Sequence, residues 1–248
     1  MIKLIRADIW RIIRKKSFNV FFIIALLYVL FRCWINYELY KEAYSAVVAL
    51  VSAQKLFSII VGVIIFNAIY ADDFKAMSYV AVIGRGTSRV RVVLAKLIDA
   101  VLVAAFMYGV TCFLSTLVVT GAGLVFGETL TKAWFGSFVI NFYKTIGYIA
   151  LSSMVVYITN NVPLGIITLL VQYILVPASN ALFAMNETLR KFHIERLHYA
   201  GLADNALMDL LFGDYFMAAA KLAFGLVVFF GTVVVVTTVL FDKKELEF

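Results

Sequence analysis

The chain has 248 residues, of which 64% are apolar and only 15% are charged, and its mean hydropathy is +0.97. A soluble globule of this length needs roughly a quarter of its residues charged to cover its surface, so this composition excludes a water-soluble protein. The net charge of +7 does not indicate nucleic acid, because the Lys and Arg lie between apolar runs without interleaved stacking aromatics, and lipid headgroups are the expected anionic partner.

Residues 1–17 form an amphipathic arm. At helical spacing Ile5, Ile9 and Ile12 share one face, and Arg11 and Arg14 lie on the opposite face. Such a helix is expected to lie flat in the membrane interface, with its basic face held by anionic headgroups, and to turn into the first span near residues 16–17. The alternative is an ordinary positively charged flank of that span.

Six apolar runs of about 20 residues follow the arm, and this is the length that an α-helix needs to cross a bilayer. They predict an all-α integral membrane protein with one transmembrane domain over residues 1–248. The six predicted transmembrane helices are residues 18–34, 47–71, 92–120, 135–158, 163–185 and 216–241.

An even number of spans puts both termini on one side of the membrane. The arm, the segment 72–96 and the carboxyl tail together hold 13 of the 22 Lys and Arg residues, which makes that side cytoplasmic and predicts both termini there. Residues 186–215 are then an external segment with two apolar helical turns. They are expected either to re-enter the membrane or to form a surface loop. His193 and His198 lie five residues apart, on different faces of a helix, which argues against a metal site.

The segment 72–90, between the second and third spans, is predicted to be a short cytoplasmic helix followed by a glycine turn. Phe74, Met77 and Ala81 form an apolar ridge at positions i, i+3 and i+7. Nothing else in the sequence is an evident cover for this ridge. The pattern therefore favours a docking surface for a partner over a loop that rests on the membrane.

The same segment carries a resemblance to a known family. The acidic-aromatic pair Asp73–Phe74, the short helix and the sequence GRGTSRVRVVLAK leading into the third span resemble the signature of ABC type 2 exporter permeases. Residues 1–17 resemble the elbow helix of that family, and the six-span topology is similar along the whole chain. In size the chain is similar to small bacterial permeases that export lantibiotics, other bacteriocins or phenol-soluble-modulin toxins.

The resemblance implies a homodimer, or a pair with a related permease, that works on two cytosolic ABC ATPase subunits in a bacterial cytoplasmic membrane. It implies that Asp73, Phe74, Lys75 and Met77 contact the ATPase. The chain contains no G-x-x-x-x-G-K-S/T loop, so it is not expected to be an enzyme itself. ATP and Mg²⁺ are expected on the partner subunit, and no cofactor is expected in this chain.

Charged residues inside the spans are the remaining signal, because each is costly at the centre of a bilayer unless it is paired or hydrated. Four Lys or Arg residues lie near the external ends of the spans, and two of them have the amide side chain of an Asn or Gln close by in the helix. These two pairs predict a hydrated vestibule formed by Gln54, Lys55, Asn141 and Lys144. The alternative is that these lysines reach the outer headgroups, as is expected of Arg32 and Lys221. Asp99 is predicted to pair with Lys96, three residues earlier, rather than to act in a proton relay.

Three other function classes are the alternatives: an intramembrane enzyme, a self-powered carrier or channel, and a purely structural subunit. An intramembrane enzyme is disfavoured because the spans lack an H-E-x-x-H motif, a Ser-His pair or a second acid beside Asp99. The alternative function is a self-powered secondary transporter or channel for an anionic solute, which a basic vestibule would suit. Such a carrier is expected to show interrupted helices in both halves, whereas only the fifth span, which contains Pro177, is interrupted.

Overall fold

A computed structural model of the chain describes residues 1–40, 42–121, 123, 126–185 and 198–243. Within these residues all the secondary structure is helical. The helices are α1 (Ile2–Arg14), α2 (Lys16–Tyr40), α3 (Ala43–Phe66), the π-helix η1 (Asn67–Ala71), α4 (Asp72–Lys75), α5 (Ser78–Gly84), α6 (Arg89–Gly121), α7 (Glu128–Thr159), α8 (Val162–Met185), α11 (Tyr199–Phe212) and α12 (Tyr215–Asp242).

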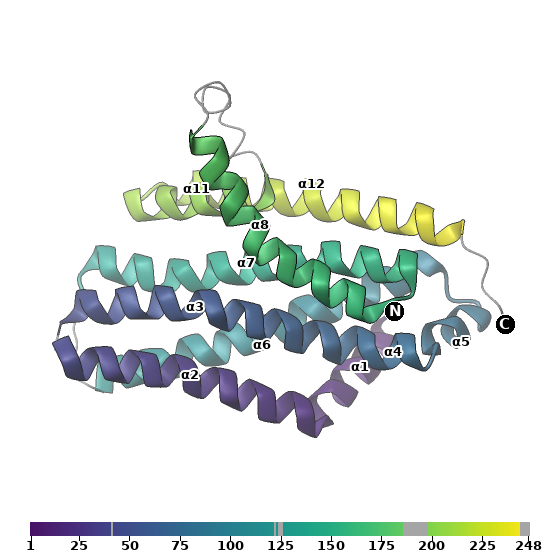
Figure 1. The fold of residues 1–248 in the computed structure, drawn as a ribbon, viewed down its shortest axis with the longest axis horizontal. Helices are drawn as coiled ribbons and strands as arrows, with labels where there is room; N and C mark the ends of the chain where they lie inside the picture. The colour runs from purple at the N-terminus through teal and green to yellow at the C-terminus, as the bar shows by residue number, and fades with distance from the viewer. Residues whose placement is uncertain (41, 122, 124–125, 186–197, 244–248) are drawn as a thin grey trace.

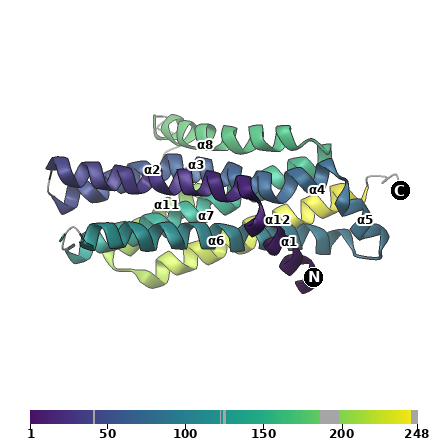
Figure 2. The same ribbon diagram turned by 90° about the horizontal axis from the view of Figure 1, so that it is seen from below.

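The long helices lie side by side along the long axis of the molecule, and α8 crosses them obliquely (Figures 1 and 2). Five described segments are long and apolar enough to cross a membrane, and they contain five of the six predicted spans: Lys16–Ile35, Tyr44–Lys75, Arg89–Gly121, Glu128–Thr159 and Tyr215–Asp242. The other predicted span, residues 163–185, falls in α8, whose described apolar part is the shorter Val162–Ala178. The chain is therefore a multi-pass membrane protein.

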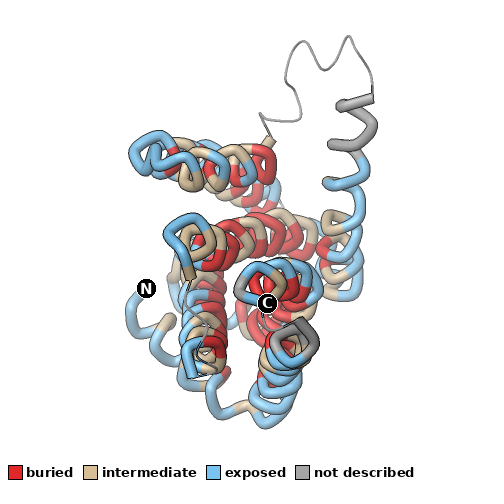
Figure 3. Tube along the Cα trace, turned by 90° about the vertical axis from the view of Figure 1, so that its left-hand side faces the viewer, coloured by how far each residue is buried: buried red, intermediate tan, exposed pale blue. Residues whose placement is uncertain are grey.

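Helix α7 is at the centre of the bundle and contacts α3, α6, α8, α11 and α12. Buried residues face this centre, and exposed residues face outward, as Figure 3 shows from one end. Many outward residues are large and apolar, including Phe31, Phe106, Phe113 and Val227. In a bilayer this surface faces lipid, because acyl chains solvate it as well as a protein core would.

Helix α1 and the last turn of α12 lie at the same end of the bundle, which we call the junction end (Figure 1). Arg89, at the start of α6, donates a hydrogen bond to the carbonyl of Phe241, near the end of α12. Helices α1 and α2 are separated by a break at Lys15, whose backbone is extended, with φ −73° and ψ 111°. The predicted turn into the first span is thus found within two residues of the predicted position.

The connection from α3 to α6 contains two departures from regular α-helix. Residues Asn67–Ala71 form a π-helical turn that buries Tyr70, and such turns are concentrated at functional sites. Met77 then adopts the left-handed conformation, with φ 49°, which is uncommon for a residue other than glycine. The predicted short helix is accordingly divided into α4 and α5, and Gly86, with φ +89°, makes the predicted turn before α6.

Helix α11 packs along α7 and α12 within the depth of the bundle. Tyr199, at its start, packs against Gly147 so closely that a Cβ on Gly147 would overlap the tyrosine ring. Leu207, further along α11, packs against Gly136 in the same way, so α11 runs alongside α7 from Gly147 toward its beginning. The part of the predicted external segment that is described therefore packs between helices rather than lying as a surface loop. Residues 186–197 of that segment, including His193, lie outside the described residues.

The acidic residues of α11 change the interpretation of two intramembrane lysines. Lys144 of α7 lies 2.5 Å from Asp204, and Lys221 of α12 lies 2.6 Å from Asp209. Lys144 and Lys221 therefore each have an acidic partner, which the expectation of a vestibule at Lys144 and of a headgroup contact at Lys221 did not include. Both lysines are neutralised by a helix that the sequence alone did not place beside them.

Candidate functional site

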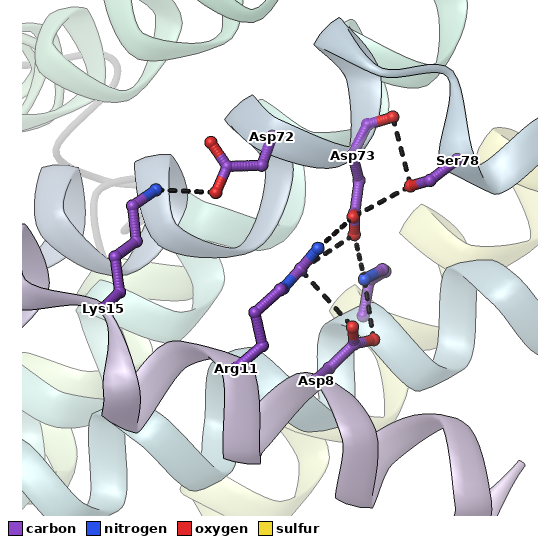
Figure 4. Close-up of polar contacts among 7 residues, drawn as sticks. Asp8, Arg11, Lys15, Asp72, Asp73 and Ser78 are labelled. Carbon is purple, nitrogen blue, oxygen red and sulfur yellow. Dashed lines mark hydrogen bonds and ion pairs between the residues drawn. The ribbon is translucent and has the colours of Figure 1, made fainter.

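The most concentrated group of charged side chains is at the junction end, where α1, α4, α5 and α6 meet (Figure 4). Asp73 of α4 accepts hydrogen bonds from Arg11 of α1, with one Nη2–Oδ2 distance of 3.2 Å, and from the ammonium of Lys96 of α6. Lys96 also donates to Asp8 of α1 at 2.7 Å, and Ser78 of α5 donates to Asp73 at 2.9 Å. We call Asp8, Arg11, Asp73, Ser78 and Lys96 the junction cluster.

Local sequence explains how each member reaches the cluster. Asp8 and Arg11 are three residues apart, so they project from adjacent turns of one helix face and also contact each other at 3.3 Å. Asp73 follows directly on the π-helical turn, and Lys96 lies two turns inside α6. Ser78 begins α5 immediately after the left-handed Met77, and this sharp turn brings its hydroxyl back to Asp73.

Three of the five members of the junction cluster are almost closed to solvent. Asp8, Asp73 and Lys96 are exposed by 7%, 5% and 5%, and the cluster borders a cavity of about 190 Å³ that Leu4, Tyr79, Val82 and Val92 also line. The hydrogen bond from Arg11 to Asp73 raises the pKa of the Arg11 guanidinium, against the opposing effect of burial. Charges buried to this degree are tolerated only when each one has a partner, so the members of the cluster depend on one another.

A second carboxylate near the cluster has no such partner. Asp99 is fully buried, one turn beyond Lys96, and neither of its oxygens receives a hydrogen bond from a described residue. The predicted Asp99–Lys96 pair is wrong, because the ammonium of Lys96 is directed to Asp8 and Asp73 instead.

An aromatic group covers the other side of α4. The ring of Phe74 stacks on Tyr79 with centroids 4.6 Å apart and meets Tyr157 of α7 edge-on at 5.2 Å. Tyr157 in turn lies 5.1 Å from Phe241 of α12, and Tyr79 donates to the side-chain oxygen of Asn160, in the turn between α7 and α8. The ends of α7 and α12 are thus packed around the segment that carries Asp73.

These contacts correct the prediction of an uncovered apolar ridge. Phe74 is 8% exposed and Asp73 is 5% exposed, so both are turned into the chain and neither side chain presents a free surface. Lys75 and Met77 are exposed, and the exposed fraction of Met77 is 57%. Of the four residues predicted to contact an ATPase, Lys75 and Met77 are therefore on the surface, and Asp73 and Phe74 lie directly behind them.

The arm is helical, as predicted, but its two faces differ from the prediction. Ile12 is buried against the bundle, and Ile5 and Ile9 are partly exposed. Arg11 was assigned to the headgroup-binding face, and that assignment is wrong, because Arg11 is directed inward to Asp73 and Asp8. Arg14 remains on the outside, 4.0 Å from the ring centre of Trp10.

The predicted vestibule residues are brought close together, but they do not form one hydrated surface. The Asn141 amide donates to the side-chain oxygen of Gln54 at 3.0 Å, and Gln54 is completely buried. Lys55 is exposed and Lys144 is paired with Asp204. The structure therefore does not show a vestibule lined jointly by all four residues, because Gln54 is completely buried and accepts the Asn141 amide inside the bundle.

The interior below Gln54 and Asn141 is polar. Tyr108 of α6 donates to Ser58 of α3 at 2.7 Å and lies 2.8 Å from Thr145 of α7, and Tyr173 of α8 donates to the carbonyl of Ser58 at 2.8 Å. Gln172 of α8 adds a hydrogen bond to Ser152 of α7 at 3.0 Å. A polar track therefore joins four helices, and α8 closes it on one side.

The sequence analysis did not identify Asp8, Tyr157 or Phe241 as site residues. A signal for Asp8 was present, because this acidic residue lies at helical spacing close to the apolar face that contains Ile12. A charge on such a face indicates a buried partner. No local signal distinguishes Tyr157 and Phe241 from other aromatics in the spans.

Among the described residues, no three His, Cys, Asp or Glu side chains are arranged to hold a metal ion. The junction cluster joins α1, the short helices α4 and α5, and α6 through ion pairs and hydrogen bonds. No protein-family model matches this chain, and no curated protein matches it either, so its function has to be argued from this geometry.

Proposed function

We propose that the chain is the membrane permease subunit of an ATP-driven ABC exporter that moves amphipathic peptides out of a bacterial cell. In this proposal two permease copies span the cytoplasmic membrane with six helices each, and two cytosolic ATPases bind at the junction end. The junction cluster transmits the motion of the ATPases to the spans. The observation that carries the proposal is that Asp73 binds Arg11 of α1 and Lys96 of α6 at the same time.

This arrangement suits transmission because no member of the cluster is free to move alone. Displacing α4 by a few ångströms would separate Asp73 from both cations, leaving charges buried without partners, at a cost of several kcal/mol. Moving the arm and α6 together with α4 avoids that cost. A force on α4 is therefore passed to α1 and α6, and the aromatic contacts of Phe74 pass it to α7 through Tyr157.

The surface on which a partner would act lies beside the cluster. Lys75 and Met77 are exposed on the surface, whereas Asp73 and Phe74, which precede them in the chain, are buried. The left-handed backbone of Met77 keeps this turn sharp and presents its side chain at the tip. An exposed methionine is well suited to an adaptable protein contact, since its thioether chain is flexible and polarizable.

The polar track between α3, α6, α7 and α8 supports a transport role over a purely structural one. Hydroxyl and amide groups inside a membrane bundle are costly unless they pair with one another or face a polar solute. Helix α8 covers the track through Tyr173 and Gln172 and has fewer neighbours than α7. In the proposal, movement of α8 opens this interior.

The alternative of a self-powered carrier or channel for an anion has less support. This alternative was based on the basic residues near the external ends of the spans. Two of these residues, Lys144 and Lys221, are neutralised by Asp204 and Asp209. Helix α8 continues through Pro177, and the departure from α-helix inside a described span is the π-helical turn Asn67–Ala71, so the described residues do not show matching broken helices in the two halves of the chain.

The experiment that tests the proposal is purification of the tagged chain from its native membranes, followed by detection of any bound ABC ATPase. The double variant Lys75→Glu/Met77→Asp is expected to reduce ATPase retention at least about tenfold, because it puts two negative charges on the contact surface. The control is Lys243→Glu, an exposed residue at the same end. Full-length protein recovered in membranes at the wild-type level shows that the variants fold.

A nucleotide-dependent contact gives a second readout. A cysteine at position 77, in a background without Cys33 and Cys112, is expected to cross-link to the ATPase, and the yield is expected to change when ATP is bound. The proposal is contradicted if the double variant retains the ATPase as well as the Lys243→Glu control does, or if no ATPase co-purifies with the wild-type chain.

A further inference from the structure

A groove at the junction end is lined by positive charges that have no acidic partner among the described residues. It has a volume of about 370 Å³ and lies between α1, the turn after α5 and the start of α6. Three cationic side chains line it, Lys3 from α1, Arg85 from the turn and Arg91 from α6, together with the hydroxyl of Thr87. The groove is completed by Met1, Leu4, Ala7 and Val82.

These three cations differ from their neighbours in the junction cluster. Arg11, Lys15 and Lys96 each contact an aspartate, whereas none of Lys3, Arg85 and Arg91 forms an ion pair with any residue that the structure describes. No acidic residue in the described part of the chain lines the groove. Three like charges gathered around one concave surface repel one another, and an anion placed among them relieves that repulsion.

An apolar trough adjoins the cationic groove. It has a volume of about 690 Å³ and runs along the outer face of α1, and it shares Lys3 and Ala7 with the groove. Its apolar lining includes Ile2, Trp10 and Ile13, whose exposed fractions are 79%, 58% and 51%. In Figure 2, α1 projects from the bundle. Apolar surface of this extent, on a helix beside the spans, requires a cover other than water.

The chemistry of the two adjoining surfaces fits an amphiphile with an anionic head and an apolar tail. We propose that they bind one anionic phospholipid of the adjacent leaflet, with its phosphate between Lys3, Arg85 and Arg91 and an acyl chain along the trough beside Trp10 and Ile13. Thr87 donates a hydrogen bond to the headgroup. A soluble phosphate compound would bind in the groove and leave the apolar trough exposed to water. Because a lipid covers both surfaces, the trough favours a lipid as the ligand.

The bound lipid would hold three separate segments of the chain together. Arg85 and Arg91 lie on either side of the glycine turn that leads into α6, and Lys3 is near the start of α1. A phosphate shared by all three adds a contact between α1 and α6 beside the junction cluster, whose cavity shares Leu4 and Val82 with the groove. This inference does not rest on ATP-driven export, and it would hold for any membrane protein with this arrangement.

The test uses the full chain in nanodiscs of phosphatidylcholine and follows quenching of tryptophan fluorescence by lipids with brominated acyl chains. The chain has three tryptophans, and the difference between wild type and Trp10→Phe reports the quenching at Trp10. Brominated phosphatidylglycerol is expected to quench Trp10 at about tenfold lower mole fraction than brominated phosphatidylcholine, because its headgroup is attracted by the three cations.

Arg85→Gln/Arg91→Gln is expected to bring the two lipids to equal potency. The matched control, Lys75→Gln/Lys243→Gln, removes the same charge from exposed residues at the same end and outside the groove, and it is expected to keep the preference. Equal quenching by the two lipids in the wild-type protein, or an equal loss of preference in the control, overturns the proposal. Displacement of phosphatidylglycerol by millimolar inorganic phosphate would assign the groove to a soluble anion and would also overturn it.

Discussion

The guanidinium of Arg11 donates hydrogen bonds to both carboxylate oxygens of Asp73, which is 62 residues further along the chain. This bidentate pair attaches α1 to the short helix that follows α3. Because a guanidinium and a carboxylate match in geometry as well as in charge, the pair specifies the orientation of α1 and not only its proximity. The arm is therefore a fixed part of the junction end rather than a tether lying independently on the membrane.

Asp73→Ala is expected to destabilise the protein strongly, because it leaves the buried ammonium of Lys96 and the guanidinium of Arg11 short of a partner. Removal of one member of a buried ion pair costs about 3–5 kcal/mol. The measurement is the melting temperature of the purified protein in detergent, together with hydrogen exchange of residues 2–14, which should become faster.

Asp72→Ala is the matched control for that variant. Asp72 is the preceding residue, and its pair with Lys15, at 2.8 Å, is exposed to solvent. Pairs of this kind contribute about 0–1 kcal/mol, so the melting temperature should change little. If the two variants have the same effect, the junction cluster does not stabilise the attachment of α1.

Asp99→Asn is expected to be tolerated or to stabilise the protein. The carboxyl group of Asp99 is fully buried and receives no hydrogen bond from a described residue, and an amide of the same shape cannot ionise there. Asp8→Asn should have the opposite effect, because Asp8 is a partner of Lys96. Melting temperatures of the two variants check this, and a loss with Asp99→Asn as large as with Asp8→Asn would show that Asp99 is needed in its charged form.

Gly147→Ala is expected to detach α11 from α7. A Cβ at this position would lie 2.0 Å from a ring carbon of Tyr199, so the tyrosine has to move. Overpacking of this kind costs about 1–3 kcal/mol. The melting temperature should fall, and a cysteine at position 203, which is fully buried in α11, should become reactive in a background without Cys33 and Cys112.

Gly109→Ala provides the control, because nothing lies within 4 Å of the Cβ that it would add. It should leave both readouts unchanged. A second variant tests the mechanism: Gly147→Ala combined with Tyr199→Leu should recover part of the lost stability, since the smaller side chain makes room for the added methyl. Equal effects of Gly147→Ala and Gly109→Ala would argue against the packing of Tyr199 on Gly147.

Lys55 remains a candidate for a hydrated position, and its exposure can be measured. A cysteine at position 55, in the same cysteine-free background, is expected to react with a charged, membrane-impermeant maleimide. Cysteines at the neighbouring positions 54 and 56 are expected to be inert, because Gln54 is buried and Leu56 is an exposed apolar residue that faces lipid. If position 55 is as unreactive as position 56, the ammonium of Lys55 does not face water.

Several elements of this structure could be predicted from the sequence because they depend on local chemistry. An apolar run of about 20 residues in lipid has to satisfy its own backbone hydrogen bonds, so the runs form helices and five of them meet the criteria for spans. The helix of the arm could also be predicted locally, because its amphipathic period is contained within the 13 residues of α1. The turns at Gly86 and Gly213 follow from the tolerance of glycine for positive φ.

What the sequence by itself determined is therefore which segments are helical, that they belong in a membrane, and where several of them end. Only the tertiary structure decided which charges are partners. Asp73 meets Arg11 and Lys96, Phe74 is covered by Tyr157, and Lys144 is neutralised by Asp204, across separations of 23 to 83 residues. These pairings depend on how the helices pack and on the rotation of each helix about its axis. A charge or a ring in one segment carries no local signal of the segment that will lie beside it, and for this reason the site could not be assembled from the pattern alone.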